Sequence, residues 1–508
     1  MIVLNGENCT LETFIQVSRW KEEVSIASSS KTRILQARAY IDEVNDSETP
    51  VYGINTGFGK LSDMTINKKD TSKLQTNLLM SHACGVGEPL KNEVVRGMML
   101  LRVNALIKGY SGIRLETLEK LIEFLNKDLI PVVFEKGSLG ASGDLAPLSH
   151  MSLPLIGLGE VFCNNIRMSA KVGLKKAGIE PLSFLGAKEG LCLINGTQAM
   201  TSIGAHILYD SFEVFEAASY SLSLTMEALQ GIINAFDPRV HELRGQPGQI
   251  EFAKKITNIL QDSKLITQQG QLRIQDAYSI RCAPQVHGAI LDTMNYVKKI
   301  VEAEMNAVTD NPIVFFEEKE VISAGNFHGE PLAFAFDYLG IALSELANIS
   351  ERRIERLVNS SLSNGLPSFL VKTPGLNSGF MIVQYSAASL VSENKVLAHP
   401  ASVDSIPSSA NQEDHVSMGS ISARKAGSIL DNVRRVIAME LFSACQACDF
   451  RGKHLLGAST SLVYQEIRKT VPFIGSDQVM YPYIHQIEEL LTNHHFLDLM
   501  KKGGMLNE

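Results

Sequence analysis

Hydrophobic residues recur every three or four positions over long stretches in the second half of the chain. One such stripe runs from Leu339 to Leu357 and another from Ile429 to Leu441. Residues at this spacing share one face of an α-helix, which then packs against other helices. The pattern beyond about residue 205 therefore predicts long helices packed as a bundle.

The first part of the chain has a more broken pattern. Residues 10–130 are typical of helices interrupted by polar and glycine-rich loops, and Pro131–Phe134 is a short extended segment. Alternating patterns predict short strands near 160–170 and 312–324 only. We expect a mainly α fold with an N-terminal region, 1–205, and a helix bundle, 206–508, although no linker marks the boundary.

A glycine-rich segment, residues 137–150 (GSLGASGDLAPLSH), carries unusual chemical potential. Glycine adopts backbone conformations that other residues avoid, so the Gly143 nitrogen could approach the carbonyl carbon of Ala141. Ring closure with loss of two waters, one from Ser142, would leave a methylene group conjugated to an imidazolone, a strong electrophile. The alternative is an ordinary turn in which Asp144 is the N-cap of the following helix. The two interpretations are compatible.

Seven motifs in the same order resemble the aromatic amino acid ammonia-lyases and aminomutases. That family forms the cofactor 4-methylidene-imidazole-5-one (MIO) from an Ala-Ser-Gly tripeptide. The resemblance implies an ammonia-lyase/fumarase-like bundle of long helices and a homotetramer with active sites composed from several subunits. The matching segments are Ala141–His150, Tyr52–Gly59, Ser81–Gly87, Asn195–Gln198, Gln275–Arg281, Gly325–His328 and Asn411–Gly419.

The resemblance assigns Tyr52 as the base that removes the β-proton of the substrate. A free phenol has a pKa near 10, so we expect hydrogen bonds or positive charge to lower the pKa of Tyr52. Arg281 offers a planar fork suited to the substrate carboxylate.

The other assignments surround the cofactor. Tyr278 and Asn195 match positions beside the MIO group, and Gln275 supports them. Phe327 is expected to form an apolar wall. Asp144 is expected to assist ring formation, although an N-cap role would explain it equally well.

Two positions bear on the substrate. His82 and Glu413 would contact an imidazole, and the carboxylate of Glu413 can accept an imidazole N–H. These residues favour elimination of ammonia from L-histidine to give trans-urocanate. The alternative is a lyase or 2,3-aminomutase of the same fold that acts on tyrosine or phenylalanine.

Composition limits the other possibilities. The 508 residues carry a net charge of −8, which argues against a nucleic-acid surface. The sequence contains no P-loop, no dinucleotide-binding glycine motif and no His-Glu-x-x-His, so neither a nucleotide nor a metal is expected. Seven scattered cysteines, the absence of a signal-peptide pattern and the absence of a long uninterrupted apolar run favour a soluble, cytoplasmic protein.

Overall fold

The computed structural model describes residues 1–47, 49–494 and 496, and 59% of the chain is helical, which confirms the mainly α prediction. The chain forms two compact units, each built from three segments. Unit 1 contains Met1–His206, Lys298–Asp337 and Pro400–Arg424, and unit 2 contains Ile207–Val297, Tyr338–His399 and the chain from Lys425 onward. The division at 205/206 stays a prediction, and residues 497–508 of its second part lie outside the described residues.

Unit 1 is organised around α4, which is buried along nearly its whole length and packs against α1 and α5. Such burial requires apolar side chains on every face, and the run from Val94 to Leu106 supplies them apart from a few polar residues. The helices are α1 (Leu11–Ser18), α2 (Ser28–Asp46), α3 (Thr71–His82), α4 (Asn92–Leu106), α5 (Leu115–Asn126), α6 (Leu145–Ser152), α7 (Ala170–Ala177) and α8 (Glu189–Ile194), with η1 (Gly59–Leu61), η2 (Lys68–Asp70), η3 (Leu153–Ile156) and η6 (Ser409–Asn411).

The strands of unit 1 are short and form small sheets of two or three strands. The strands predicted near 160–170 and 312–324 are confirmed as two antiparallel hairpins, with Val314 opposite Val321 in the second. The extended segment predicted over 131–134 is divided between two sheets. The pairs are β1 (Ile2–Leu4) parallel to β2 (Val24–Ile26), β3 (Val86–Pro89) with β5 (Phe134–Lys136), β4 (Ile130–Pro131) with β6 (Glu160–Cys163) and then β7 (Ile166–Ser169), and β8 (Ile313–Phe315) with β9 (Glu320–Ile322).

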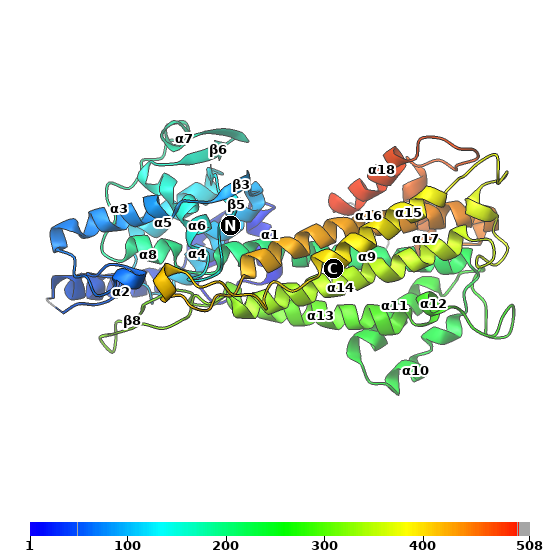
Figure 1. The fold of residues 1–508 in the computed structure, drawn as a ribbon, viewed down its shortest axis with the longest axis horizontal. Helices are drawn as coiled ribbons and strands as arrows, with labels where there is room; N and C mark the ends of the chain where they lie inside the picture. The colour runs from blue at the N-terminus through cyan, green and yellow to red at the C-terminus, as the bar shows by residue number, and fades with distance from the viewer. Residues whose placement is uncertain (48, 495, 497–508) are drawn as a thin grey trace. The chain divides into compact units, whose positions relative to one another are not determined.

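Unit 2 is a bundle of helices, and the axes of its longest members lie roughly parallel to one another (Figure 1). Four long helices, α9, α13, α14 and α16, contribute residues to both units. The helices are α9 (Gln198–Ala228), α10 (Pro238–Glu242), α11 (Pro247–Leu260), α12 (Tyr278–Arg281), α13 (Ala283–Met305), α14 (Glu330–Val358), α15 (Met381–Leu397), α16 (Gly419–Arg451), α17 (Ala458–Arg468) and α18 (Tyr481–Thr492), with η4 (Ile233–Phe236), η5 (Ser368–Leu370) and η7 (Lys453–Leu455).

The two predicted hydrophobic stripes lie in α14 and α16, and their members are buried. A polar cluster joins these helices inside the bundle. Arg353 Nη2 donates to Glu440 Oε2 at 2.8 Å, and both side chains are fully buried. Ser350 and Thr225 also donate to Glu440, so its carboxylate is well satisfied.

One described helix, α14, is long and apolar enough to cross a membrane by length and composition. Two-thirds of that stretch is buried inside the structure. Such burial is typical of a helix in the core of a globular protein.

Candidate active site

A cavity of about 760 Å³ in unit 1 gathers five of the predicted site residues. Its lining includes Tyr52, His82, Ser142, Asn195 and Glu413. They come from the loop after α2, the end of α3, the turn before α6, the end of α8 and the segment before α16. Residues distant in the sequence therefore meet at one site.

The Ala141–Gly143 turn is tightly packed against residue 196. Gly143 has a φ of +73°, and a Cβ built there would lie 2.2 Å from the Gly196 carbonyl oxygen. The next residue, Asp144, donates its backbone N–H to that same oxygen at 2.7 Å. Only glycine combines this left-handed conformation with so close an approach. The turn thus meets a steric requirement for the predicted ring.

The side chain of Asp144 connects the turn to neighbouring segments by hydrogen bonds. Its fully buried carboxylate accepts hydrogen bonds from Met200 N at 2.8 Å, Ser420 Oγ at 2.6 Å and Ser138 Oγ at 2.9 Å. Burial raises its pKa, and these hydrogen bonds oppose that rise. The N-cap interpretation needs correction: Asp144 stands at the N-cap position of α6 but makes no side-chain cap bond there. Its carboxylate bonds instead to the first turn of α9, which sequence distance concealed.

Ser142 and Glu413 are in direct contact. Ser142 Oγ donates to Glu413 Oε1 at 2.9 Å, and Ser408 Oγ donates to Glu413 Oε2 at 2.9 Å. Backbone hydrogen bonds in both directions between residues 408 and 413 fix the segment. The predicted imidazole-binding carboxylate therefore lies next to the side chain that would supply the methylene carbon.

Tyr52 lies at the start of its glycine-rich loop, and its hydroxyl accepts the N–H of Gly59 at 3.3 Å. The pKa of Tyr52 is raised above its usual value. Burial is the main cause; Glu413 and Asp310 also raise the pKa, whereas the Gly59 N–H and Lys188 lower it. The expectation of a lowered pKa is thus wrong for this structure, because desolvation of the phenolate outweighs the groups that favour it.

His82 is the last residue of α3, and one of its ring nitrogens is hydrogen-bonded within that helix. Its Nδ1 lies 2.9 Å from the Leu78 carbonyl oxygen, which can only accept, so Nδ1 carries a proton. Burial is the main cause of a lowered His82 pKa. The neutral ring therefore keeps Nε2 as an acceptor.

Asn195 follows α8 and is almost fully buried at 4% exposure. Its Oδ1 is buried and has no hydrogen-bond partner among the described residues. An unsatisfied buried acceptor is costly unless a ligand supplies a donor. Together with the Gly143 turn, this acceptor in the cavity fits an MIO group and an amine bound beside it.

Four predicted residues belong neither to the described lining of this cavity nor to the Ala141–Asp144 turn. Gln275, Tyr278 and Arg281 belong to unit 2, where Tyr278 is 70% exposed. The Arg281 guanidinium lies 4.4 Å from the centre of the Tyr278 ring, and its Nε donates to Asp276 O at 2.9 Å. Phe327 belongs to unit 1. The roles assigned to these four residues stay predictions.

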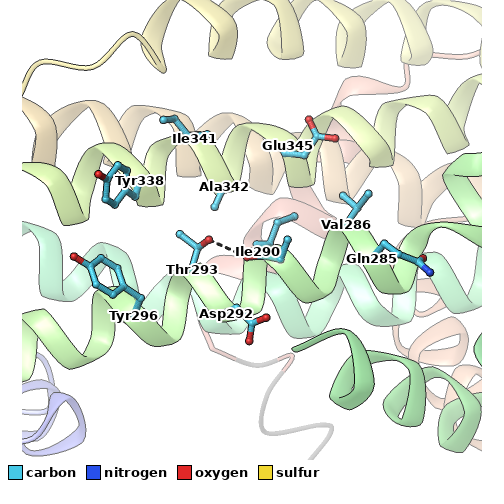
Figure 2. A pocket seen from close by; sticks show the side chains of 11 residues that line it. Gln285, Val286, Ile290, Asp292, Thr293, Tyr296, Tyr338, Ile341, Ala342 and Glu345 are labelled. Atoms are coloured by element: carbon cyan, nitrogen blue, oxygen red, sulfur yellow. Dashed lines mark hydrogen bonds between the residues drawn. The ribbon is translucent and has the colours of Figure 1, made fainter. Parts of the chain in front are cut away.

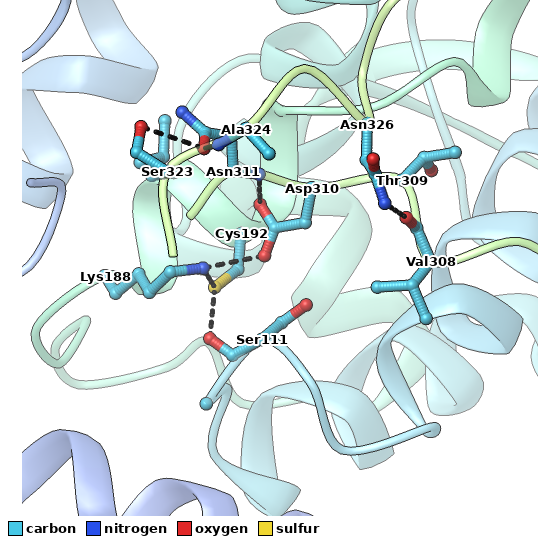
Figure 3. A network of polar contacts seen from close by, with 12 residues as sticks. Ser111, Lys188, Cys192, Val308, Thr309, Asp310, Asn311, Ser323, Ala324 and Asn326 are labelled. Atoms are coloured by element: carbon cyan, nitrogen blue, oxygen red, sulfur yellow. Dashed lines mark hydrogen bonds and ion pairs between the residues drawn. The ribbon is translucent and has the colours of Figure 1, made fainter. Parts of the chain in front are cut away.

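Sequence reasoning missed two features of the site. Ser408 holds the second oxygen of Glu413, and only the fold reveals that contact. Close enough to Tyr52 to influence its pKa, Lys188 and Asp310 form a fully buried ion pair (Figure 3). A signal for the pair existed: the charged residues 188 and 189 stand directly before the apolar segment Gly190–Ile194.

Two groups of side chains bring potential metal ligands together. Ligand atoms of His328, Glu330 and His415 lie within 4.8 Å of one another. The second group consists of Asp210, Glu213 and His494. The expectation that the protein needs no metal stays a prediction.

Comparisons with known proteins agree with this geometry. The sequence profile of the aromatic amino acid lyases matches residues 9–469. Histidine ammonia-lyase 1 of Fusobacterium nucleatum is 55% identical, with 99% of this chain and 98% of the relative covered. Among solved structures, Trypanosoma cruzi histidine ammonia-lyase has a TM-score of 0.91 and 42% identity, covering 99% and 95% of the two chains. Streptomyces globisporus tyrosine aminomutase has a TM-score of 0.95 and 36% identity, covering 99% and 98%.

Proposed function

Because the chain belongs to the aromatic amino acid lyase family, we propose that it is a histidine ammonia-lyase, a carbon–nitrogen lyase that converts L-histidine to trans-urocanate and ammonia. Full-length relatives of this activity share 55% of their residues with the chain, against 36% for the tyrosine aminomutase. The observation that carries the proposal is the meeting of Ser142, Glu413 and His82 at one cavity.

The proposed cofactor arises from the chain itself. MIO formed from Ala141, Ser142 and Gly143 supplies an electrophilic carbon that activates the amino acid for elimination. Asp144 and Gly143 hold the turn in a conformation suited to ring closure. The amide oxygen of Asn195 accepts a hydrogen bond from a donor in the cavity, such as the substrate amine.

The remaining residues bind and orient L-histidine. Glu413 accepts an imidazole N–H, a group that a phenyl ring lacks, and His82 offers Nε2 as a second polar contact. Tyr52 takes the β-proton on its phenolate oxygen. Arg281 of another copy of the chain pairs with the substrate carboxylate.

A homotetramer with composite sites follows from the same proposal. In unit 2 an apolar groove of about 790 Å³ lies between α13 and α14 (Figure 2). Tyr296, Tyr338 and Ile341 line it, and each is nearly half exposed. A contiguous apolar surface of this kind is typical of an interface, here with a second copy. Association would also bring the exposed Tyr278 and the partly buried Arg281 to a site in another subunit.

We also propose a cytoplasmic location. All seven cysteines are free in the described part of the chain, and four of them are buried. Reduced thiols of this kind fit a reducing compartment.

The direct test measures ammonia release and ultraviolet product formation from purified protein with L-histidine, L-tyrosine or L-phenylalanine. Urocanate from L-histidine alone is the expected result. An aromatic acrylate or a β-amino acid from tyrosine or phenylalanine would overturn the substrate assignment while keeping the cofactor. Inactivity with all three, together with an unchanged peptide mass over 141–143, would overturn the proposal as a whole.

A further inference from the structure

Three charged side chains lie fully buried and close together in unit 1. Lys188 Nζ lies 2.7 Å from Asp310 Oδ2 and 3.4 Å from Cys192 Sγ. Arg102 Nη2 lies 4.0 Å from Asp310 Oδ1. Figure 3 shows the Lys188 ammonium directed toward Asp310 and the Cys192 sulfur, which itself points to Ser111. We refer to Arg102, Lys188 and Asp310 as the buried triad.

The triad contains two cations and one anion. Burial by itself lowers the pKa of Lys188, but Asp310 and Cys192 raise it above the usual value. Arginine starts from so high a pKa that Arg102 keeps its charge despite burial. Burial raises the pKa of Cys192 to about 12, so its thiol is neutral. The triad therefore carries a net charge of +1.

Hydrogen bonds from Arg102 connect the segments before and after Asn195 with the segment that precedes Asp310. Its Nε donates to Cys192 O in α8 at 2.7 Å, and its Nη1 donates to Thr309 O at 2.8 Å and to Gln198 Oε1 at 3.1 Å. Asn195 lies between residues 192 and 198. Arg102 therefore bonds to the backbone three residues before Asn195 and to a side chain three residues after it.

The Tyr52 loop rests on the same segments. Val51 and Ile54, which flank it, pack in one cluster with Ala187 and Val314. A Cβ on Gly53 would lie 2.6 Å from the Leu191 side chain and 3.2 Å from Pro312. The residues contacted by the loop lie one to four positions from Lys188 or Asp310 in the sequence. The ion pair therefore holds in place the two segments against which the loop packs.

Lys188 also has a special backbone. Its φ of +66° lies in the left-handed region, which a residue with a long side chain rarely adopts. Such conformations persist where the surroundings impose them, and they cluster at functional sites.

We propose that the buried triad positions Tyr52 and Asn195 for the reaction and places a fixed positive charge near Tyr52 that favours its phenolate. This inference rests on the proposed function. The charged and titratable groups that face Tyr52 are Lys188 and Asp310 of the triad, together with Glu413. His82 and Lys60 line the same cavity.

Substitutions that change the net charge of the triad test the proposal, because a purely structural role would not make the pH dependence follow that charge. Lys188→Met reduces the net charge of the triad to zero, and Asp310→Asn raises it to +2. The double variant keeps +1. It also avoids leaving the Asp310 carboxylate buried without its partner, which protects folding.

The measurement is kcat/KM for L-histidine as a function of pH. In Lys188→Met we expect the acid limb of this pH–rate profile to move to higher pH and kcat to fall by about tenfold. In Asp310→Asn the limb moves to lower pH, and in the double variant it returns near the wild-type position. Loss of two waters at 141–143, read by mass spectrometry, confirms cofactor formation in each variant.

A matched control lies at the adjacent residue. Glu189 is paired with Arg114 at 2.6 Å, also at the start of α8. Arg114→Met removes a cation from this helix end without touching the triad, so the acid limb stays in place. Equal movement of the limb in Arg114→Met, or no movement in either single triad variant, would overturn the inference.

A second readout does not depend on activity. Ultraviolet titration of tyrosine ionisation, taken as the difference from Tyr52→Phe, isolates the Tyr52 phenol in each background. The midpoint of Tyr52 ionisation in the variants should follow the same order as the acid limbs of their pH–rate profiles. A protein inactive with L-histidine that nevertheless shows this order would refute the proposed function but retain the electrostatic inference, whereas the same midpoint in all backgrounds would refute the inference.

Discussion

The hydroxyl-bearing carbon of Ser142 becomes the methylene carbon of the proposed cofactor, so that residue has no substitute. Ser142→Ala should abolish both loss of two waters and nearly all turnover. Mass spectrometry of the 141–143 peptide and the urocanate assay measure these effects. Ser152→Ala in α6 is the control, since its hydroxyl donates to the Leu148 carbonyl oxygen within the same helix at 2.8 Å. Wild-type activity in Ser142→Ala would eliminate the MIO assignment.

Glu413 is predicted to recognise the imidazole through its charge. Glu413→Gln keeps the shape but weakens a charge-assisted hydrogen bond, so kcat/KM for L-histidine should fall by about tenfold or more. Steady-state kinetics measure the loss, and light scattering checks that assembly is retained. Asp414→Asn, at the exposed neighbouring position, should have little effect. Identical kinetics for Glu413→Gln and the wild type would place the imidazole elsewhere.

The raised pKa of Tyr52 sets the direction of the pH dependence. A base acts only when deprotonated, so kcat/KM should increase from neutral toward alkaline pH as the phenol ionises. His82, whose pKa is lowered, stays neutral throughout that range. A pH–rate profile tests this expectation. A flat profile from pH 7 to 10, about the ordinary phenol pKa, would remove Tyr52 as the base.

The sequence motifs identified residues of the site but not the surroundings that set their pKa values. Tyr52, His82, Ser142, Asn195 and Glu413 were all identified from their motifs, and they line one cavity. The direction of the Tyr52 pKa was wrong because it depends on burial and on Lys188, Asp310 and Glu413 in space. A motif contains no information on desolvation.

At the scale of elements, the ion pair between α14 and α16 gives a stability prediction. Arg353→Met leaves the Glu440 carboxylate buried without its cation and should cost about 3–5 kcal/mol. Denaturant unfolding measures the loss. The double variant Arg353→Met/Glu440→Gln removes both charges and should recover much of it. Equal stability of the single variant and the wild type would show that the pair is not needed.

Periodicity predicted the elements well because it reflects which helix faces are buried. The stripes at 339–357 and 429–441 became the buried faces of α14 and α16. Asp144 shows the limit of local rules. Its sequence context fits an N-cap of α6, but the first turn of α9 lies closer to its carboxylate.

For the whole molecule, the α13–α14 groove predicts how association affects activity. Ile341→Arg places a charge in the apolar groove and should shift the proposed tetramer toward smaller species. Turnover should fall with assembly, while the cofactor still forms. Light scattering, the urocanate assay and mass spectrometry measure these three properties. Leu243→Arg, at a position 91% exposed, is the control. A fully active monomer would contradict composite sites.

The sequence by itself determined the helical class, the short strands near 160–170 and 312–324, and the residues capable of the chemistry. Periodicity and side-chain reactivity are local properties, and both can be read along one chain. The tertiary structure decided which of those residues meet, why position 143 must be glycine, and that Glu413 touches Ser142. It also placed Arg102, Lys188 and Asp310 together across more than 200 positions. Their burial and mutual charge exist only in the folded state, because water screens isolated charges in an unfolded chain.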